Sequence, residues 1–148
     1  MGQRRRAREC ALQMLFQIDM AGGVPAEVYP HFWKEHEAEI EVREFAQGLV
    51  EGVMREREAL DRVISGSVDN WRIERMAVVD RNILRVAVYE LAWLPDTPSV
   101  VVLDEAIEVG KKYGSEQSGS FINGILDSVR KRIERGEVPS ARSTGERS

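Results

Sequence analysis

Cysteine and histidine are scarce in this sequence of 148 residues. Cys10 is the single cysteine, so no disulfide can form within the chain and no cysteine-based metal site is available. The two histidines, His31 and His36, are five residues apart, which places them off a common face of a helix. We therefore expect the protein to use no metal ion and no cofactor.

Long apolar runs are also missing. No window approaches the ~18 uninterrupted apolar residues of a membrane-spanning helix. Residues 1–6 carry three arginines and could pass for the basic part of a secretory signal, but Arg8, Glu9 and Asp19 interrupt the stretch that would have to be apolar. We expect the protein to be cytoplasmic and to have no membrane partner.

The common catalytic and phosphate-binding motifs are absent as well. The sequence has no glycine-rich phosphate loop, no dinucleotide fingerprint, no G-x-S-x-G elbow and no H-E-x-x-H pair. The adjacent carboxylates Asp104 and Glu105 point to different faces of a helix, while Glu105 and Glu108 form a pair typical of a solvated surface. This pattern favours a binding protein, and we expect no enzymatic activity.

Charge is unevenly distributed along the chain. The net charge is −4, which argues against the broad basic surface of a general nucleic-acid binder. A local basic patch is nevertheless present at the start, and acidic residues are concentrated further along at Glu35, Glu37, Glu39, Glu41 and Glu44. Any binding of nucleic acid must therefore depend on that local patch, whose members are Arg4, Arg5, Arg6 and Arg8.

Apolar residues recur with the period of an α-helix, and glycine and proline fall between the periodic segments. We therefore predict a single all-α domain over residues 1–136. Residues 137–148 contain almost no apolar side chains and are predicted to be a disordered tail. The predicted helices are Arg4–Met20, Ala26–His36, Ile40–Ser65, Ile73–Leu94 (with a break near Val78 as an alternative), Ser99–Tyr113 and Glu116–Arg135.

Phe16 stands almost opposite the core-facing stripe of the first predicted helix. Two interpretations are equally open: Phe16 packs beneath a neighbouring helix, or it binds a partner. The stripe itself follows helical spacing and consists of Ala7, Ala11, Met14, Leu15 and Ile18.

The segment from Val79 to Leu91 is apolar nearly all round, which predicts a central buried helix. Asp80 and Arg81 stand at its start, where we expect the chain to reach the surface. Gly124 lies inside the last predicted helix, where glycine is less stable than alanine. We therefore expect that another helix approaches closely at this position and leaves no room for a side chain.

Three blocks of the sequence, in order, resemble the NusB family. The first is RRRARECALQMLFQ at residues 4–17, and the second is WRIERMAVVDRNILRVAVYEL at residues 71–91. The third runs from Asp96-Thr97-Pro98 through DEAIE (104–108), KKYG (111–114) and Ser118 to FINGILD (121–127). Together the blocks span almost the whole chain.

The resemblance implies a compact NusB-like all-α fold of two packed helical bundles with about six to seven helices. It also implies a bacterial RNA-binding adaptor in transcription antitermination of ribosomal RNA operons. Such an adaptor works with NusE, the ribosomal small-subunit protein S-ten. The pair binds the boxA element as single-stranded RNA within the antitermination complex of RNA polymerase.

The resemblance further implies roles for individual residues. Arginines neutralise phosphates, and aromatic rings stack on unpaired bases. Gln117 is the least typical member, because this position can be acidic in the family. The residues that match RNA-binding positions are Arg4, Arg5, Arg6, Arg8, Tyr113, Gln117, Ser120 and Phe121. Those that match or adjoin NusE-binding positions are Phe16, Glu74, Asp80 and Arg81.

Three other interpretations remain. The same fold precedes the catalytic half of some ribosomal RNA cytosine methyltransferases, but we expect no such half here, because these residues leave no room for a cofactor-binding domain. A homodimer whose interface covers the arginine patch is compatible with the adaptor function. A helix-turn-helix DNA-binding protein would need a basic recognition helix, whereas the basic run of this sequence lies at its start.

Overall fold

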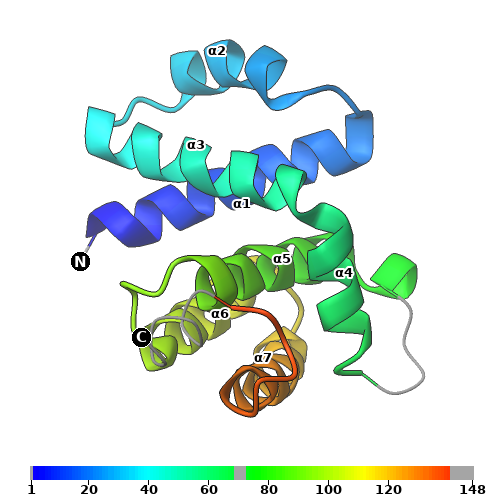
Figure 1. Cartoon of the computed structure of the whole chain (residues 1–148). Helices are drawn as coiled ribbons and strands as arrows, with labels where there is room; N and C mark the ends of the chain where they lie inside the picture. Colours follow the sequence, from blue (N-terminus) through cyan, green and yellow to red (C-terminus); the bar gives the residue numbers. More distant parts are fainter. Residues whose placement is uncertain (1, 69–72, 141–148) are drawn as a thin grey trace. The chain divides into compact units, whose positions relative to one another are not determined.

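Helices make up nearly all the regular structure of this chain (Figure 1). The computed structural model describes residues 2–68 and 73–140. Within these residues there are seven α-helices, one short 3₁₀-helix and no strand, so the predicted all-α fold is confirmed. In chain order the elements are α1 (Gly2–Ala21), α2 (Pro25–Glu35), α3 (Ile40–Arg55), α4 (Arg57–Ser65), η1 (Ile73–Arg75), α5 (Val78–Trp93), α6 (Ser99–Tyr113) and α7 (Ser118–Glu134).

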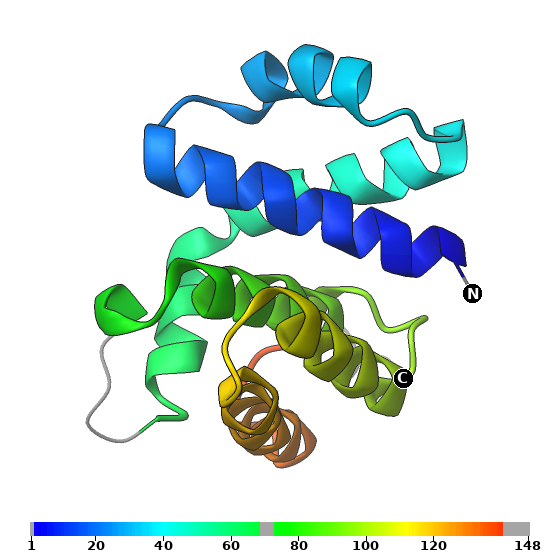
Figure 2. The same ribbon diagram turned by 180° about the vertical axis from the view of Figure 1, so that it is seen from behind.

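The helices form two compact units, each with its own packing. Unit 1, residues 1–55, holds α1, α2 and α3; α1 runs beside α3, and α2 packs on both (Figures 1 and 2). In unit 2, residues 56–148, α5 packs on α4, α6 and α7, and α6 packs on α7. The expectation that residues 1–136 fold as a single domain stays a prediction.

Local chemistry explains where the first helix ends and the second begins. Gly22 and Gly23 adopt φ angles of 80° and 101°, in the left-handed region that glycine enters without a steric penalty. This conformation stops α1 after Ala21. Pro25 then occupies the first position of α2, where its fixed φ suits a helix and its missing N–H costs no hydrogen bond.

Two of the predicted helices are divided in the structure. The predicted helix Ile40–Ser65 is interrupted at Glu56, whose φ and ψ are −101° and 16°, so the prediction of one helix is wrong. The helical period continues through this point, but α3 packs within unit 1 and α4 within unit 2. The alternative break near Val78 is confirmed, because η1 ends at Arg75 and α5 begins at Val78.

The core of unit 1 follows the predicted stripe. Every residue of that stripe on α1 is buried, with at most 5% exposure. Side chains from α2 and α3 complete this core: Val28, Phe32, Val42, Ala46, Leu49, Val50 and Val53.

Helix α5 is the buried centre of unit 2, as its all-round apolar pattern predicts. Each of its residues from Asn82 to Ala92 is buried, polar ones included. The facing core of α7 repeats with helical spacing and is also buried. It consists of Ile122, Ile125, Leu126, Val129 and Ile133.

A buried arginine on α5 is paired with a carboxylate on α4. Arg85 is 4% exposed and donates two hydrogen bonds to Asp61, from Nε to Oδ1 at 2.8 Å and from Nη2 to Oδ2 at 3.1 Å. Its third nitrogen, Nη1, donates to Oδ1 of Asn82 at 3.1 Å. This bidentate geometry offsets much of the cost of burying the guanidinium and fixes α4 against α5.

The predicted tail begins within the described residues. Val138 is 2% exposed, and Glu137 accepts a hydrogen bond from Nε of Arg135 at 2.6 Å. Residues 141–148 lie outside the described residues, so disorder of the tail stays a prediction.

Two helical glycines have opposite surroundings. A Cβ added at Gly110 on α6 would lie 2.8 Å from Cδ1 of Ile122, a fully buried side chain on α7. A Cβ added at Gly124 on α7 would meet nothing within 4 Å. The expectation that Gly124 permits a close helix approach is therefore wrong, because that approach is at Gly110.

Alanine substitutions at the two glycines should change stability in opposite directions. Gly124→Ala should stabilise the protein by about 0.5–1 kcal/mol, the helix-propensity gain of alanine over glycine. Gly110→Ala should destabilise it by about 1 kcal/mol, because overpacking outweighs that gain. Urea unfolding of the two variants and the wild type measures both changes. Equal stabilisation by both substitutions would contradict the packing described for α6 and α7.

Candidate nucleic-acid interface

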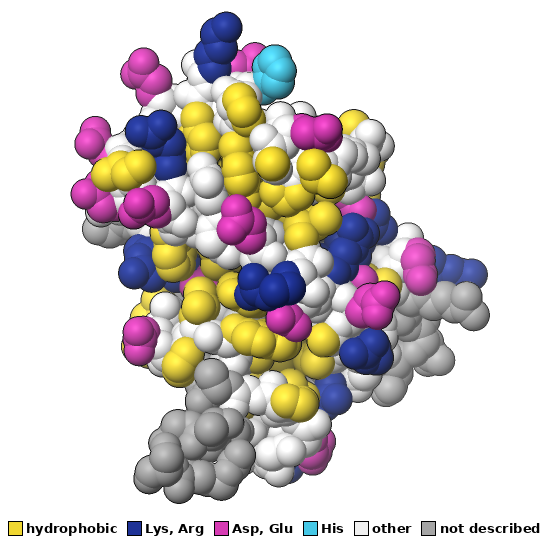
Figure 3. Space-filling model, turned by 45° about the horizontal axis from the view of Figure 1, so that its top comes forward, with side chains coloured by type: hydrophobic (Ala, Val, Ile, Leu, Met, Phe, Trp, Pro, Cys, Tyr) yellow, Lys and Arg dark blue, Asp and Glu magenta, His cyan; other side chains and the backbone are white. Residues whose placement is uncertain are grey.

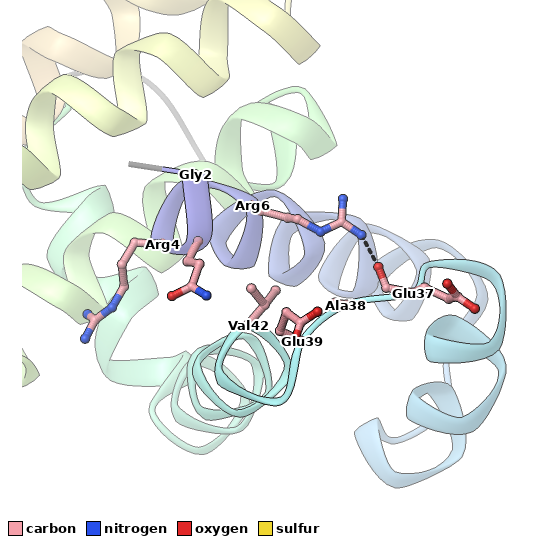
Figure 4. Close-up of a pocket in the computed structure, with 8 residues that line it drawn as sticks. Gly2, Arg4, Arg6, Glu37, Ala38, Glu39 and Val42 are labelled. Atoms are coloured by element: carbon pink, nitrogen blue, oxygen red, sulfur yellow. Dashed lines mark hydrogen bonds between the residues drawn. The ribbon is translucent and has the colours of Figure 1, made fainter.

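The arginine-rich segment forms the first turns of α1. Arg4 and Arg6 are exposed, and their side chains leave the helix in different directions (Figure 4). The guanidinium carbon of Arg4 lies 4.0 Å from the ring centroid of Phe45 on α3, within the range of a cation–π interaction. Arg6 donates a hydrogen bond from Nη2 to the backbone carbonyl of Glu37. Both cations are therefore oriented by other parts of unit 1.

Arg8 differs from its neighbours because it is only 7% exposed. It lies three and seven residues before Ala11 and Leu15, so it falls on the core side of α1. Its guanidinium carbon is 5.8 Å from the Phe45 ring centroid. A role for Arg8 in RNA binding predicts an exposed side chain, and that prediction is wrong for Arg8, while Arg5 is half-buried.

An open cleft lies between the start of α1 and the connection from α2 to α3 (Figure 4). Its volume is about 710 Å³, and a smaller hollow of about 480 Å³ shares Gln3 and Arg4 with it. Glutamates line both, so the basic segment has acidic neighbours. The face in Figure 3 likewise mixes acidic and basic side chains. The lining residues of the larger cleft are Gly2, Gln3, Arg4, Arg6, Glu37, Ala38, Glu39 and Val42.

In unit 2 the structure brings the other four predicted RNA-binding residues together at the connection from α6 to α7. Tyr113 is the last residue of α6, and Gln117 immediately precedes α7. Ser120 and Phe121 lie in the first turn of α7. Gln117 and Ser120 are exposed, whereas the two aromatic residues are half-buried. Lys112 adds a cation, with its Nζ 5.2 Å from the Tyr113 ring centroid.

A buried serine, Ser118, links this connection to helix α5. It is 1% exposed and donates from Oγ to Oδ1 of Asp80 at 2.8 Å. The same Oγ accepts a hydrogen bond from the backbone N–H of Ser115 at 2.9 Å. Sequence reasoning assigned no role to Ser118. A serine at a helix start predicts a bond within its own helix, whereas Asp80 is 38 residues away.

The four residues predicted to face NusE have unlike environments. Phe16, on α1 in unit 1, is half-buried. The other three belong to unit 2, where Glu74 is exposed on η1 and Arg81 is half-buried at the start of α5. Asp80 is 9% exposed and bonded to Ser118, so the expectation of a surface carboxylate is wrong. The first turn of α5 is covered by the α6–α7 connection at this residue.

The described residues contain no clustered metal ligands and one buried thiol. No group of three or more histidine, cysteine, aspartate or glutamate side chains in residues 2–68 and 73–140 could hold a metal ion. Burial raises the pKa of the Cys10 thiol, so it stays protonated near neutral pH and is a poor nucleophile. Among the described helices, none has the length and apolar character needed to cross a membrane.

Comparison with known proteins gives the same family as the sequence blocks. The model of the NusB family matches residues 5–131. The transcription antitermination protein NusB of Anaeromyxobacter dehalogenans is 54% identical over 128 residues, which cover 86% of this chain and 89% of that protein.

Solved structures agree with this assignment. NusB of T. maritima has 36% sequence identity and a TM-score of 0.82, with 90% of this chain and 96% of that chain covered. A NusB from a complex of the antitermination factors NusB and NusE with double-stranded RNA has 31% identity and a TM-score of 0.81, covering 88% of this chain and 98% of that chain. Sequence and fold agree over nearly the full length, and the chain belongs to the NusB family.

Proposed function

We propose that this chain is an RNA-binding adaptor in transcription antitermination. With NusE it binds boxA RNA of ribosomal RNA transcripts and joins the RNA polymerase antitermination complex in the cytoplasm, and it catalyses no reaction. The observation that carries the proposal is the α6–α7 connection, where two aromatic side chains, two exposed polar ones and Lys112 occur within ten residues. Membership of the NusB family supports the proposal.

Single-stranded RNA suits the chemistry of these side chains. The rings of Tyr113 and Phe121 can stack on bases only where the bases are unpaired. Gln117 and Ser120 offer hydrogen-bond donors and acceptors to base edges or to the 2′-hydroxyl. In unit 1, Arg4 and Arg6 are exposed and can neutralise phosphates. We propose that both groups contact the same RNA, with Arg5 as a further phosphate contact.

A protein partner is needed because the basic segment is small. The chain has a net charge of −4, and Glu37 and Glu39 line the same cleft as Arg4 and Arg6. These carboxylates reduce the attraction of phosphates to the arginines. We propose that NusE, binding at Phe16, Glu74 and Arg81, supplies further contacts to the RNA.

The length of the relatives supports an adaptor over the methyltransferase alternative. The matched NusB of Anaeromyxobacter dehalogenans is covered over 89% of its length, so that protein has no large additional domain. Self-association into a homodimer stays a prediction.

RNA binding with and without NusE tests the proposed function. Single-stranded boxA RNA should bind weakly to this protein alone and more tightly when NusE is present, because the partner extends a small basic contact surface. Fluorescence anisotropy measures both affinities, with duplex RNA and duplex DNA of the same sequence as competitors. Equal affinity for the duplexes and the single strand would contradict the stacking role of Tyr113 and Phe121.

Removing Arg4 and Arg6, the two exposed arginines at the start of α1, should weaken RNA binding and its dependence on salt. Each phosphate contact on a single strand contributes roughly 0.7 to the slope of log affinity against log salt. Arg4→Gln combined with Arg6→Gln should therefore lower the magnitude of that slope by roughly 1.4. Arg62→Gln, at an exposed arginine on α4, is the matched control and should leave the slope unchanged. The control removes one positive charge instead of two, so a decrease of roughly 0.7 in its slope would show that net charge and not position determines binding.

Truncating Phe16 should weaken binding of NusE. A buried aromatic contact in an interface contributes about 2 kcal/mol or more, so Phe16→Ala should raise the Kd for NusE about 30-fold in calorimetry. Phe45→Ala, at the other half-buried phenylalanine of unit 1, is the control and should leave that Kd unchanged. A Phe16→Ala variant that is less stable but binds NusE normally would identify Phe16 as an ordinary core residue.

A further inference from the structure

Ser118 connects two segments that are far apart in the sequence. Its Oγ donates to Oδ1 of Asp80, at the third position of α5, and accepts from the N–H of Ser115. Its hydroxyl therefore serves as donor and acceptor at once, and both it and the Asp80 carboxylate are buried. A polar group that is buried and bonded in this way has few alternative positions, since any other position would leave it unsatisfied.

Gly114 lies directly against the side chain of Ser118. A Cβ at Gly114 would lie 2.3 Å from Oγ and 2.7 Å from Cβ of Ser118, so only glycine permits this approach. Ser115, which donates to Ser118, is the next residue. The turn after α6 is thus closed directly onto the first residue of α7.

The residues held by this bond flank the proposed RNA contacts. Tyr113 immediately precedes Gly114, and Phe121 lies one helical turn after Ser118. A shift of Ser118 would move the first turn of α7 and the end of α6, and with them both rings. Stacking on a base depends on ring position and orientation, so such a shift would reduce it.

We propose that Asp80 and Ser118 are positioning residues for RNA binding: their buried hydrogen bond fixes the α6–α7 connection so that Tyr113 and Phe121 are preorganised to stack on RNA bases. This inference rests on the proposed function and adds to it a role for a carboxylate that is itself too buried to be a surface contact. Preorganisation raises affinity because the free protein has less freedom to lose on binding.

A double-mutant cycle separates positioning from stability. Ser118→Ala and Asp80→Ala each leave a buried polar partner without its bond and should lower stability. Each should also weaken binding of single-stranded boxA RNA, measured with NusE present, by about tenfold. In the double variant the buried hydroxyl and carboxylate are both removed, and only the N–H of Ser115 lacks its former acceptor. Stability should therefore partly recover, whereas RNA affinity should stay about tenfold below wild type because the connection is still not held.

Three further measurements complete the experiment. Asp80→Asn retains an oxygen that accepts from Ser118, so RNA affinity should recover to within about threefold of wild type. Ser128→Ala, at a half-buried serine on α7, the helix of Ser118, is the matched control and should leave RNA affinity unchanged. Affinity for NusE without RNA should be unchanged in Ser118→Ala.

All binding is measured below the melting temperature of each variant. If Ser118→Ala does not fold, Ser118→Cys replaces it, because its thiol is a weaker donor and acceptor of similar volume.

The outcomes distinguish this inference from the proposed function. If the wild type fails to bind boxA RNA even with NusE, the proposed function and the inference are both overturned. If the wild type binds and both single alanine variants bind equally well, only the inference is overturned. Recovery of RNA affinity along with stability in the double variant would also overturn it, because the bond would then contribute to folding alone. Loss of affinity in Asp80→Asn equal to that in Asp80→Ala would overturn it too, since charge would then be the cause.

Discussion

Burial of helix α5 is the constraint on which the arrangement of unit 2 depends. A charged side chain on a buried helix is costly unless it is paired and hydrogen-bonded. Arg85 is paired with Asp61 on α4, and Asp80 is bonded to Ser118 on α7. The polar residues of α5 therefore fix which helices pack against it and in what register, in a way that apolar contacts alone would not specify.

Small residues determine how closely α6 and α7 approach each other. Gly110 admits the side chain of Ile122, and Gly114 admits Ser118. These two contacts lie on either side of Tyr113, so the helix packing also determines where this ring is presented. A connection between two tightly packed helices has little conformational freedom left to lose if it binds a ligand.

In unit 1, Arg4 and Arg6 are oriented by groups that carry no negative charge. Phe45 lies beneath the guanidinium of Arg4 and orients it without neutralising its charge, and a backbone carbonyl does the same for Arg6. Neither of these two contacts involves a carboxylate. Glu37 and Glu39 line the same cleft and lower the positive potential around these two guanidinium groups.

The sequence by itself determined the helices, their core-facing stripes and the family, because helical period and family blocks are local patterns. Through the family resemblance it also gave Tyr113 and Phe121 as candidate RNA-binding residues. Tertiary structure alone decided the break at Glu56 and the burial of Arg8 and Asp80. An aspartate at the start of a helix has the same local pattern whether it faces water or a serine 38 residues further along. Only the packing of distant segments decides between these two environments. Here it makes Asp80 a buried hydrogen-bond acceptor instead of a surface charge.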